Sequence, residues 1–145
     1  MKLPGPDHPI TITATPKRIR VSAGGVVIAD TTHALTLKEA SYPAVQYVPR
    51  KDANMELLAR TDRVTRCPYK GTASYYSAKV EGGKDLVWYY EQPLDEVGRI
   101  KGLVCFFNEK VDIELDGELQ QRPDSPWSHR VKSDAQNDAP ALTRG

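Results

Sequence analysis

The sequence has little of three things that often reveal a function: cysteine, long apolar runs and net charge. Its 145 residues include two cysteines, and 20 basic side chains nearly balance 19 acidic ones. Two cysteines are too few for the disulfide framework of a small secreted domain, so we expect free thiols in a reducing compartment. There is no run of roughly 18 apolar residues and no apolar signal-peptide core, and a net charge of +1 gives no long-range attraction to nucleic acid. These absences predict a cytoplasmic protein with neither a membrane nor a nucleic-acid partner.

Motifs for metal, nucleotide and acyl-transfer chemistry are also missing. The sequence has no Cys-x-x-Cys pair, so a structural zinc site lacks its ligands. It has neither a Gly-x-x-x-x-Gly-Lys phosphate loop nor a Gly-x-Gly-x-x-Gly fingerprint, and no Gly-x-Ser-x-Gly nucleophile elbow. The three histidines, His8, His33 and His129, are scattered. We therefore predict no metal site and assign no cofactor.

The sequence does contain a succession of short segments with alternating or β-branched apolar residues. Such segments are typical of half-buried strands. Gly24 and Gly25 separate two of them and predict a tight hairpin, because glycine adopts positive φ at little cost. The predicted strands are residues 10–14, 18–22, 26–29, 34–37, 45–48, 72–80, 86–90, 103–107 and 111–115.

Helix is predicted only in short pieces. Asp52 is a candidate N-cap for a helix from Ala53 to about Arg60. One or two helical turns are expected within residues 94–99, and residues 61–71 have no clear period and are expected to form a loop. We therefore predict a mostly β, small antiparallel fold, a twisted-sheet or barrel-like arrangement with one short helix.

One domain is expected over residues 10–117. Residues 1–9 would be a flexible lead-in and residues 118–145 a polar flexible tail. Gln, Pro, Ser, Asp and Arg dominate the tail, and such a composition buries too little surface to offset the entropy of ordering. Trp127 is its largest apolar side chain and a candidate for docking back onto the domain.

The turn Cys67-Pro68-Tyr69-Lys70-Gly71 is the densest group of chemically versatile residues. Pro68 stiffens the backbone, and Gly71 permits a sharp entry into the next strand. If the turn brings Lys70 close to Cys67, its charge favours the thiolate, a potential nucleophile. The alternative is that Cys67 is a buried packing residue and Lys70 a solvated charge.

Aromatic residues and one arginine are the next candidates. Tyr75, Trp88 and Tyr90 lie on two consecutive predicted strands, and alternation places Trp88 and Tyr90 on one face. Such a face suits either a ligand pocket or plain cross-strand packing. Arg50 follows the predicted strand that contains Tyr47; it would either hold an anionic group or lie on the surface.

These motifs resemble a known family. The resemblance covers about Ile19 to Gly117 and is to the bacterial family called domain of unknown function 427. It implies an Mss4-like β fold with little helix. Zinc sites of that fold use Cys-x-x-Cys pairs. This sequence lacks such pairs, so the resemblance does not imply metal binding here. The family's nucleotidyltransferase-like label implies nucleotide handling, although no Asp-x-Asp pair that would hold Mg²⁺ is present. The matching residues are Ala23-Gly24-Gly25, Ile28 to Thr31, Glu39, Tyr47-Val48-Pro49, Thr65 to Tyr75, Trp88-Tyr89-Tyr90 with Pro93, and Phe106-Phe107.

Three hypotheses on function follow. The first is a small-ligand-binding domain, with or without catalysis, whose site lies where the Cys67–Gly71 turn meets the aromatic face and accepts a small anionic ligand. The second is a structural module that self-associates as a homodimer, and the third is a nucleotide-handling transferase. In the first, Cys67, Lys70 and Glu39 are the candidate catalytic residues, with Glu39 as a base. The candidate ligand-binding residues are Tyr47, Arg50, Tyr75, Trp88 and Tyr90.

Overall fold

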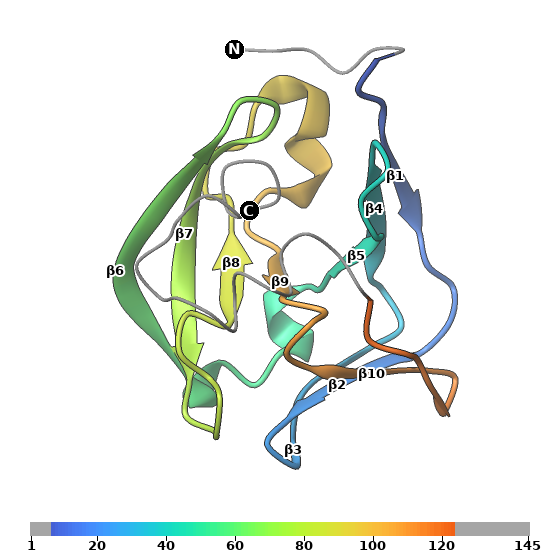
Figure 1. Ribbon diagram of the computed structural model, residues 1–145, viewed down its shortest axis with the longest axis vertical. Helices are drawn as coiled ribbons and strands as arrows, with labels where there is room; N and C mark the ends of the chain where they lie inside the picture. Colours follow the sequence, from blue (N-terminus) through green and yellow to red (C-terminus); the bar gives the residue numbers. More distant parts are fainter. Residues whose placement is uncertain (1–6, 124–145) are drawn as a thin grey trace.

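The computed structural model describes residues 7–123, which form three antiparallel sheets and three short 3₁₀ helices (Figure 1). The predicted mostly β fold is confirmed, and the sheets do not close into a barrel. The strands are β1 (Ile10–Ala14), β2 (Ile19–Ala23), β3 (Val26–Thr31), β4 (Leu35–Glu39), β5 (Val45–Tyr47), β6 (Leu58–Cys67), β7 (Gly71–Ala78), β8 (Val87–Tyr89), β9 (Val104–Phe106), β10 (Asp112–Leu115) and β11 (Glu118–Leu119).

Two of the sheets contain the strands of the N-terminal half, and one of them also takes in β10 and β11 from the other end of the described chain. One sheet has the order β1-β4-β5 and the other β11-β10-β2-β3. The predicted hairpin between β2 and β3 is confirmed: Gly24 and Gly25 take φ values of 55° and 78°, which side chains with a Cβ rarely adopt. In the register of β1 with β4, Ile10 lies opposite Glu39, so the start of β1 is next to a residue of the predicted site.

The third sheet contains the largest departure from the sequence prediction. Its order is β6-β7-β8-β9. The predicted helix from Ala53 to Arg60 is wrong, and so is the predicted loop up to Cys67, because η2 (Met55–Leu57) is followed directly by the ten-residue strand β6. A turn is present only at residues 68–70. β6 is the outermost strand and exposes much of its length to solvent. Its side chains therefore lack the apolar alternation of a buried strand, and pairing with β7 holds it in place.

The remaining short elements lie near the predicted positions. The helical turns expected within residues 94–99 are confirmed as η3 (Asp95–Ile100), and η1 (Arg50–Asp52) follows β5. Most of the predicted lead-in and most of the predicted tail, with Trp127 and His129, lie outside the described residues. No helix between residues 7 and 123 is both long and apolar enough to cross a membrane.

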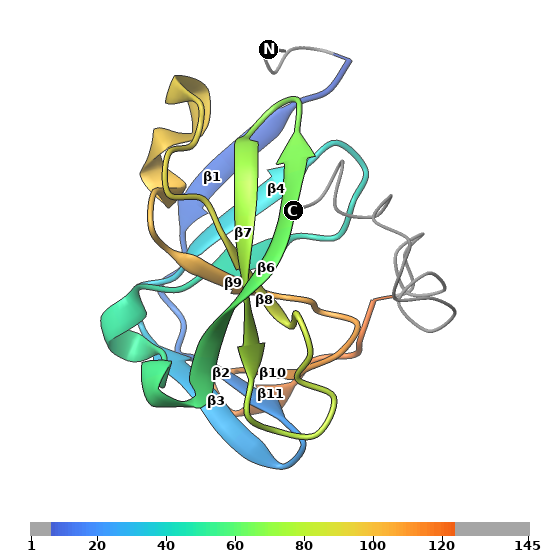
Figure 2. The same ribbon diagram turned by 90° about the vertical axis from the view of Figure 1, so that its left-hand side faces the viewer.

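The sheets of β1-β4-β5 and β6-β7-β8-β9 face each other across the core (Figures 1 and 2). They are joined where Val48, after β5, and Val104 of β9 exchange backbone hydrogen bonds of 2.8 and 2.9 Å. The core between them is aromatic: Tyr47, Tyr75 and Trp88 are fully buried. The end of β6 and the end of β4 approach each other at one end of this core, and the candidate site lies there.

Candidate functional site

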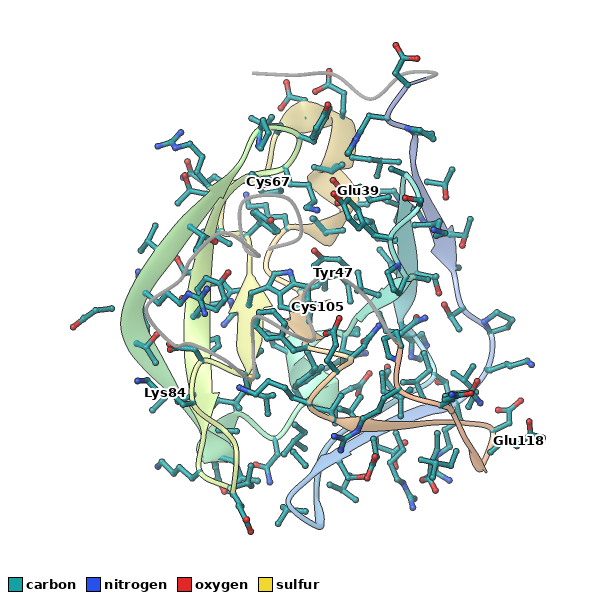
Figure 3. The ribbon with its side chains drawn as sticks, in the orientation of Figure 1. Glu39, Tyr47, Cys67, Lys84, Cys105 and Glu118 are labelled. Carbon is teal, nitrogen blue, oxygen red and sulfur yellow. The ribbon has the colours of Figure 1, made fainter. Side chains whose placement is uncertain are left out.

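The core contains an unusual group of polar side chains, which we call the polar core cluster: Glu39, Tyr47, Cys67, Lys70 and Tyr90. Each is at most 4% exposed. They come from β4, β5, β6, the turn after β6 and the residue after β8. Figure 3 shows Glu39 and Cys67 on opposite sides of the space between the two sheets, with Tyr47 below them. The fold therefore brings together residues that are up to about 50 positions apart in the sequence.

The Cys67–Gly71 turn directs Lys70 inward. Cys67 ends β6 and pairs with Gly71, which starts β7. Gly71 has a φ of 113°, a conformation that favours glycine. The carbonyl of Lys70 accepts a hydrogen bond of 3.0 Å from the backbone amide of Leu94, which fixes the turn against the segment before η3. A lysine that would ordinarily be solvated is thus placed in the core.

Lys70 forms a buried ion pair with Glu39. Its ammonium group donates to Oε1 of Glu39, and the side chains are 1% and 4% exposed. The second carboxylate oxygen, Oε2, bonds Nε2 of His8 at 2.8 Å. Removing two charges from water costs several kcal/mol per ion, which their attraction offsets only with good geometry. The pair is therefore poor as a device for stability alone.

His8 and Tyr69 cover the pair. Their rings stack with centroids 3.7 Å apart and an interplanar angle of 7°. The side chain of His8 is 19% exposed, so it lies between Glu39 and solvent. Sequence reasoning placed His8 in a loose lead-in and gave Tyr69 no role. One signal pointed to His8: with Ile10 and Ile12 it has the period of two of a strand face.

The two tyrosines of the cluster differ in their hydrogen bonds. The hydroxyl oxygen of Tyr47 accepts a bond of 3.1 Å from Nε1 of Trp88. The hydroxyl of Tyr90 is buried and has no hydrogen-bond partner among residues 7–123. Burial is the largest cause that raises the pKa of Tyr90 well above its ordinary value, and burial does the same for Tyr47. Both phenols are therefore neutral and able to donate a proton in a hydrogen bond.

Cys67 is held as a thiol. Burial is the largest cause that raises its pKa, and the Glu39 carboxylate acts in the same direction. The Lys70 ammonium lowers the pKa, as the sequence argument anticipated, but its effect is smaller than that of burial. The turn does bring Lys70 and Cys67 together, yet the resulting environment favours the neutral form. Cys105, the other free cysteine, is also buried.

The remaining predicted ligand residues divide between two faces of the third sheet. Tyr75 and Trp88 are register partners and are fully buried on the inner face, where the hydroxyls of Tyr75 and Thr65 are 2.8 Å apart. Arg50 lies on the other face. Its guanidinium donates to the hydroxyl of Tyr76 at 2.6 Å and lies 4.6 Å from the ring centroid of Tyr89.

Arg50, which the sequence assigned to the same site as Cys67 and Lys70, therefore lies apart from them. Tyr76 is the chain neighbour of Tyr75, and side chains of successive strand residues point to opposite faces. Arg50 is held there by Tyr76 and by the carbonyl of Gly102, to which its Nε donates at 2.6 Å. It supplies no charge to the polar core cluster.

The described residues do not provide a ready set of metal ligands. Between residues 7 and 123, no three His, Cys, Asp or Glu side chains are grouped so that they would hold a metal ion. In the polar core cluster the potential ligands are Glu39 and Cys67, with His8 beyond the carboxylate, and Lys70 already occupies one carboxylate oxygen. The side chains of the polar core cluster can donate and accept hydrogen bonds and transfer protons.

Comparison with known proteins identifies one family. The model of the family described as a domain of unknown function (DUF427) matches residues 11–117. This range contains all five members of the polar core cluster and leaves out His8. A search of curated proteins finds no match.

Proposed function

We propose that this chain, which belongs to the DUF427 family, binds a small organic ligand in the polar core cluster. The observation that carries the proposal is the Lys70–Glu39 ion pair, buried in an otherwise aromatic core. A well-packed apolar pair would serve stability as well or better. Lysine and glutamate are almost never fully buried unless they are paired, so their burial together favours a role other than stability.

Each residue of the cluster has a distinct role in this proposal. Lys70 supplies N–H donors and holds the carboxylate of Glu39, which is the candidate base. Tyr47 and Tyr90 supply hydroxyl groups, and Cys67 contributes a neutral, polarisable wall. Trp88 orients Tyr47 through its indole N–H. These are the parts of a site for proton transfer as well as for binding.

Access to the cluster involves His8 and Tyr69. All five cluster residues are closed to solvent, so a ligand enters only when a covering group moves. The side chain of His8 is held by one ring stack and one hydrogen bond, and the backbone beside it is held where the Pro9 carbonyl accepts a bond of 2.8 Å from the Ala40 amide. Tyr69 lies in the turn whose backbone is fixed to Leu94. In this proposal the side chain of His8 moves and both backbone segments stay in place.

The two alternative functions receive less support. For a homodimer, the exposed edge is β6, but a register shift between Arg60 and Val64 interrupts it, and irregular edge strands with charged side chains discourage pairing. Tyr90 is fully buried and is not available to a partner. For a nucleotide, a phosphate would need cations, and the one ammonium in the cluster is already neutralised by Glu39.

A thermal unfolding screen tests the proposal. The probes are malate, pyruvate, glycerol, inorganic phosphate and AMP, with and without Mg²⁺, each raised to high millimolar concentration. A ligand at 100 times its Kd stabilises the native state by roughly 2.7 kcal/mol. The control is the double variant Lys70→Met/Glu39→Leu, which removes both charges together.

We expect at least one probe to raise the melting temperature of the wild type and to have no effect on the double variant. If no probe stabilises the wild type, or if the double variant responds equally, the polar core cluster is not the ligand site.

Light scattering on the wild type and on Val64→Lys tests the alternative of self-association. A dimer that dissociates in Val64→Lys would favour self-association through β6.

A further inference from the structure

Two hydroxyl hydrogens in the polar core cluster have no acceptor among residues 7–123. The hydroxyl of Tyr90 is without any partner among residues 7–123. The one hydrogen bond of the Tyr47 hydroxyl within the same range comes from Nε1 of Trp88, and an indole N–H is a donor only. The oxygen of Tyr47 therefore acts as acceptor, and its own hydrogen remains to be donated.

This arrangement points to a missing acceptor atom. A buried donor without a partner costs about 1–3 kcal/mol, and most buried polar groups in proteins are satisfied. Both hydroxyls belong to the polar core cluster and are fully buried, so an acceptor that reaches either of them lies inside the core.

The charges around the two hydroxyls select the kind of acceptor. Lys70 and Glu39 have formal charges that cancel, so the cluster has no cation to spare for an anion. The environment already opposes negative charge: burial and, to a lesser degree, the Glu39 carboxylate raise the pKa values of Tyr47, Cys67 and Tyr90. A ligand carboxylate or phosphate in the same place would face the same two costs.

We infer that the polar core cluster binds a neutral carbonyl group, that of a ketone, an aldehyde or an amide, whose oxygen accepts a hydrogen bond from Tyr90, with Tyr47 as the second hydroxyl of the cluster that has a hydrogen to donate. The inference rests on the proposed function and names its ligand class. It replaces the small anionic ligand expected from the sequence. A phenol donor on the carbonyl oxygen also polarises it.

Three small planar probes separate a carbonyl ligand from an anion. Acetone and acetamide are neutral, and acetate has nearly the same size and shape but carries a charge. Their binding is measured by saturation-transfer NMR at pH 8, where acetate is fully ionised. The proteins are the wild type, Tyr90→Phe and the control Tyr42→Phe, in which a tyrosine outside the cluster loses its hydroxyl.

We expect acetone and acetamide to bind the wild type at least tenfold more tightly than acetate. In Tyr90→Phe their affinity should fall about three- to tenfold, the effect of one neutral hydrogen bond, and in Tyr42→Phe it should not change. Tyr90→Phe removes a hydroxyl that has no partner, so its melting temperature should equal or exceed that of the wild type. That result would show that any loss of binding is not a loss of folding.

Three results would overturn the inference. Preferential binding of acetate would show that the ligand is an anion and not a neutral carbonyl compound. The polar core cluster would remain the proposed ligand site. Equal binding to wild type and Tyr90→Phe would place the probes elsewhere. Binding of none of the three would mean that a buried water is the acceptor, and the proposed function would then depend on the screen with the double variant.

Discussion

At the scale of single residues, the behaviour of Lys70, Glu39 and Cys67 is decided by burial more than by residue type. Lysine and glutamate are almost never fully buried unless paired, and here each is the other's partner. Cys67 lies near the same ammonium group, yet burial outweighs that charge and raises the pKa of its thiol. Two predictions belong to this scale.

The first prediction concerns the Lys70–Glu39 ion pair. Lys70→Met leaves Glu39 buried with one hydrogen bond from His8, and removing one member of a buried pair typically costs about 3–5 kcal/mol of the free energy of unfolding. Glu39→Leu should cost a similar amount. The double variant Lys70→Met/Glu39→Leu should recover most of the loss. Urea denaturation of the four proteins measures this, and costs of the single variants that simply add in the double variant would contradict a direct pairing.

The second concerns the thiol. In Cys105→Ala, Cys67 is the one remaining cysteine. We expect iodoacetamide to label it very slowly at pH 7, because a buried thiol with a raised pKa provides little thiolate. The rate should increase only above about pH 9. Rapid labelling at neutral pH would show that the site opens readily and that Cys67 is a nucleophile. Cys67→Ala is the control for labelling at other groups.

At the scale of elements, strands with regular alternation were predictable and the edge strand was not. β1, β2 and β10 alternate along most of their length, and the sequence placed all three to within a residue or two. β6 was mistaken for a helix and a loop because its exposed face and the register shift after Arg60 break the period. Turn geometry, in contrast, is local, so the effect of a substitution in a single turn can be predicted.

Gly83, in the loop between β7 and β8, has no room for a side chain. A Cβ at this position would lie 2.0 Å from the carbonyl oxygen of Ala78, and the Gly83 carbonyl accepts a bond of 2.7 Å from the Ala78 amide. Gly83→Ala should therefore destabilise the protein by about 2–3 kcal/mol. The control is Gly98→Ala in η3, which meets nothing within 4 Å and should be neutral or stabilising by up to about 1 kcal/mol.

Thermal or urea unfolding of both glycine variants is the measurement. A neutral Gly83→Ala would mean that the loop rearranges without cost to the β7–β8 pair. A destabilising Gly98→Ala would mean that η3 depends on its glycine for a reason other than space.

At the scale of the whole molecule, three buried acids of the polar core cluster make stability depend on alkaline pH. Cys67, Tyr47 and Tyr90 all have pKa values raised in the native state, with burial as the largest cause. The native protein therefore keeps protons that the unfolded chain releases, from about pH 9 for the thiol and about pH 10 for the phenols. Stability is full below these values and falls as pH rises above them.

The free energy of unfolding should fall by about 1.4 kcal/mol per pH unit for each group that is ionised in the unfolded chain but not in the native protein. Urea denaturation between pH 7 and pH 11 measures it. Tyr90→Phe removes one of the three groups and should reduce the slope above pH 10 accordingly. A stability that stays constant up to pH 11 would show that the core admits water and that the cluster is not sealed.

The sequence by itself determined the local features of this protein: short alternating strands, the Gly24-Gly25 hairpin and the turn that contains Cys67 and Lys70. These depend on backbone preferences and on a period of two, which neighbouring residues specify. Only the tertiary structure decided which distant groups meet. Glu39 and Lys70 are joined across two sheets, His8 closes over them, and Arg50 is excluded because it belongs to the opposite face of the third sheet. Burial, which turns these residues into a candidate site, is a property of the packed core and of no single segment.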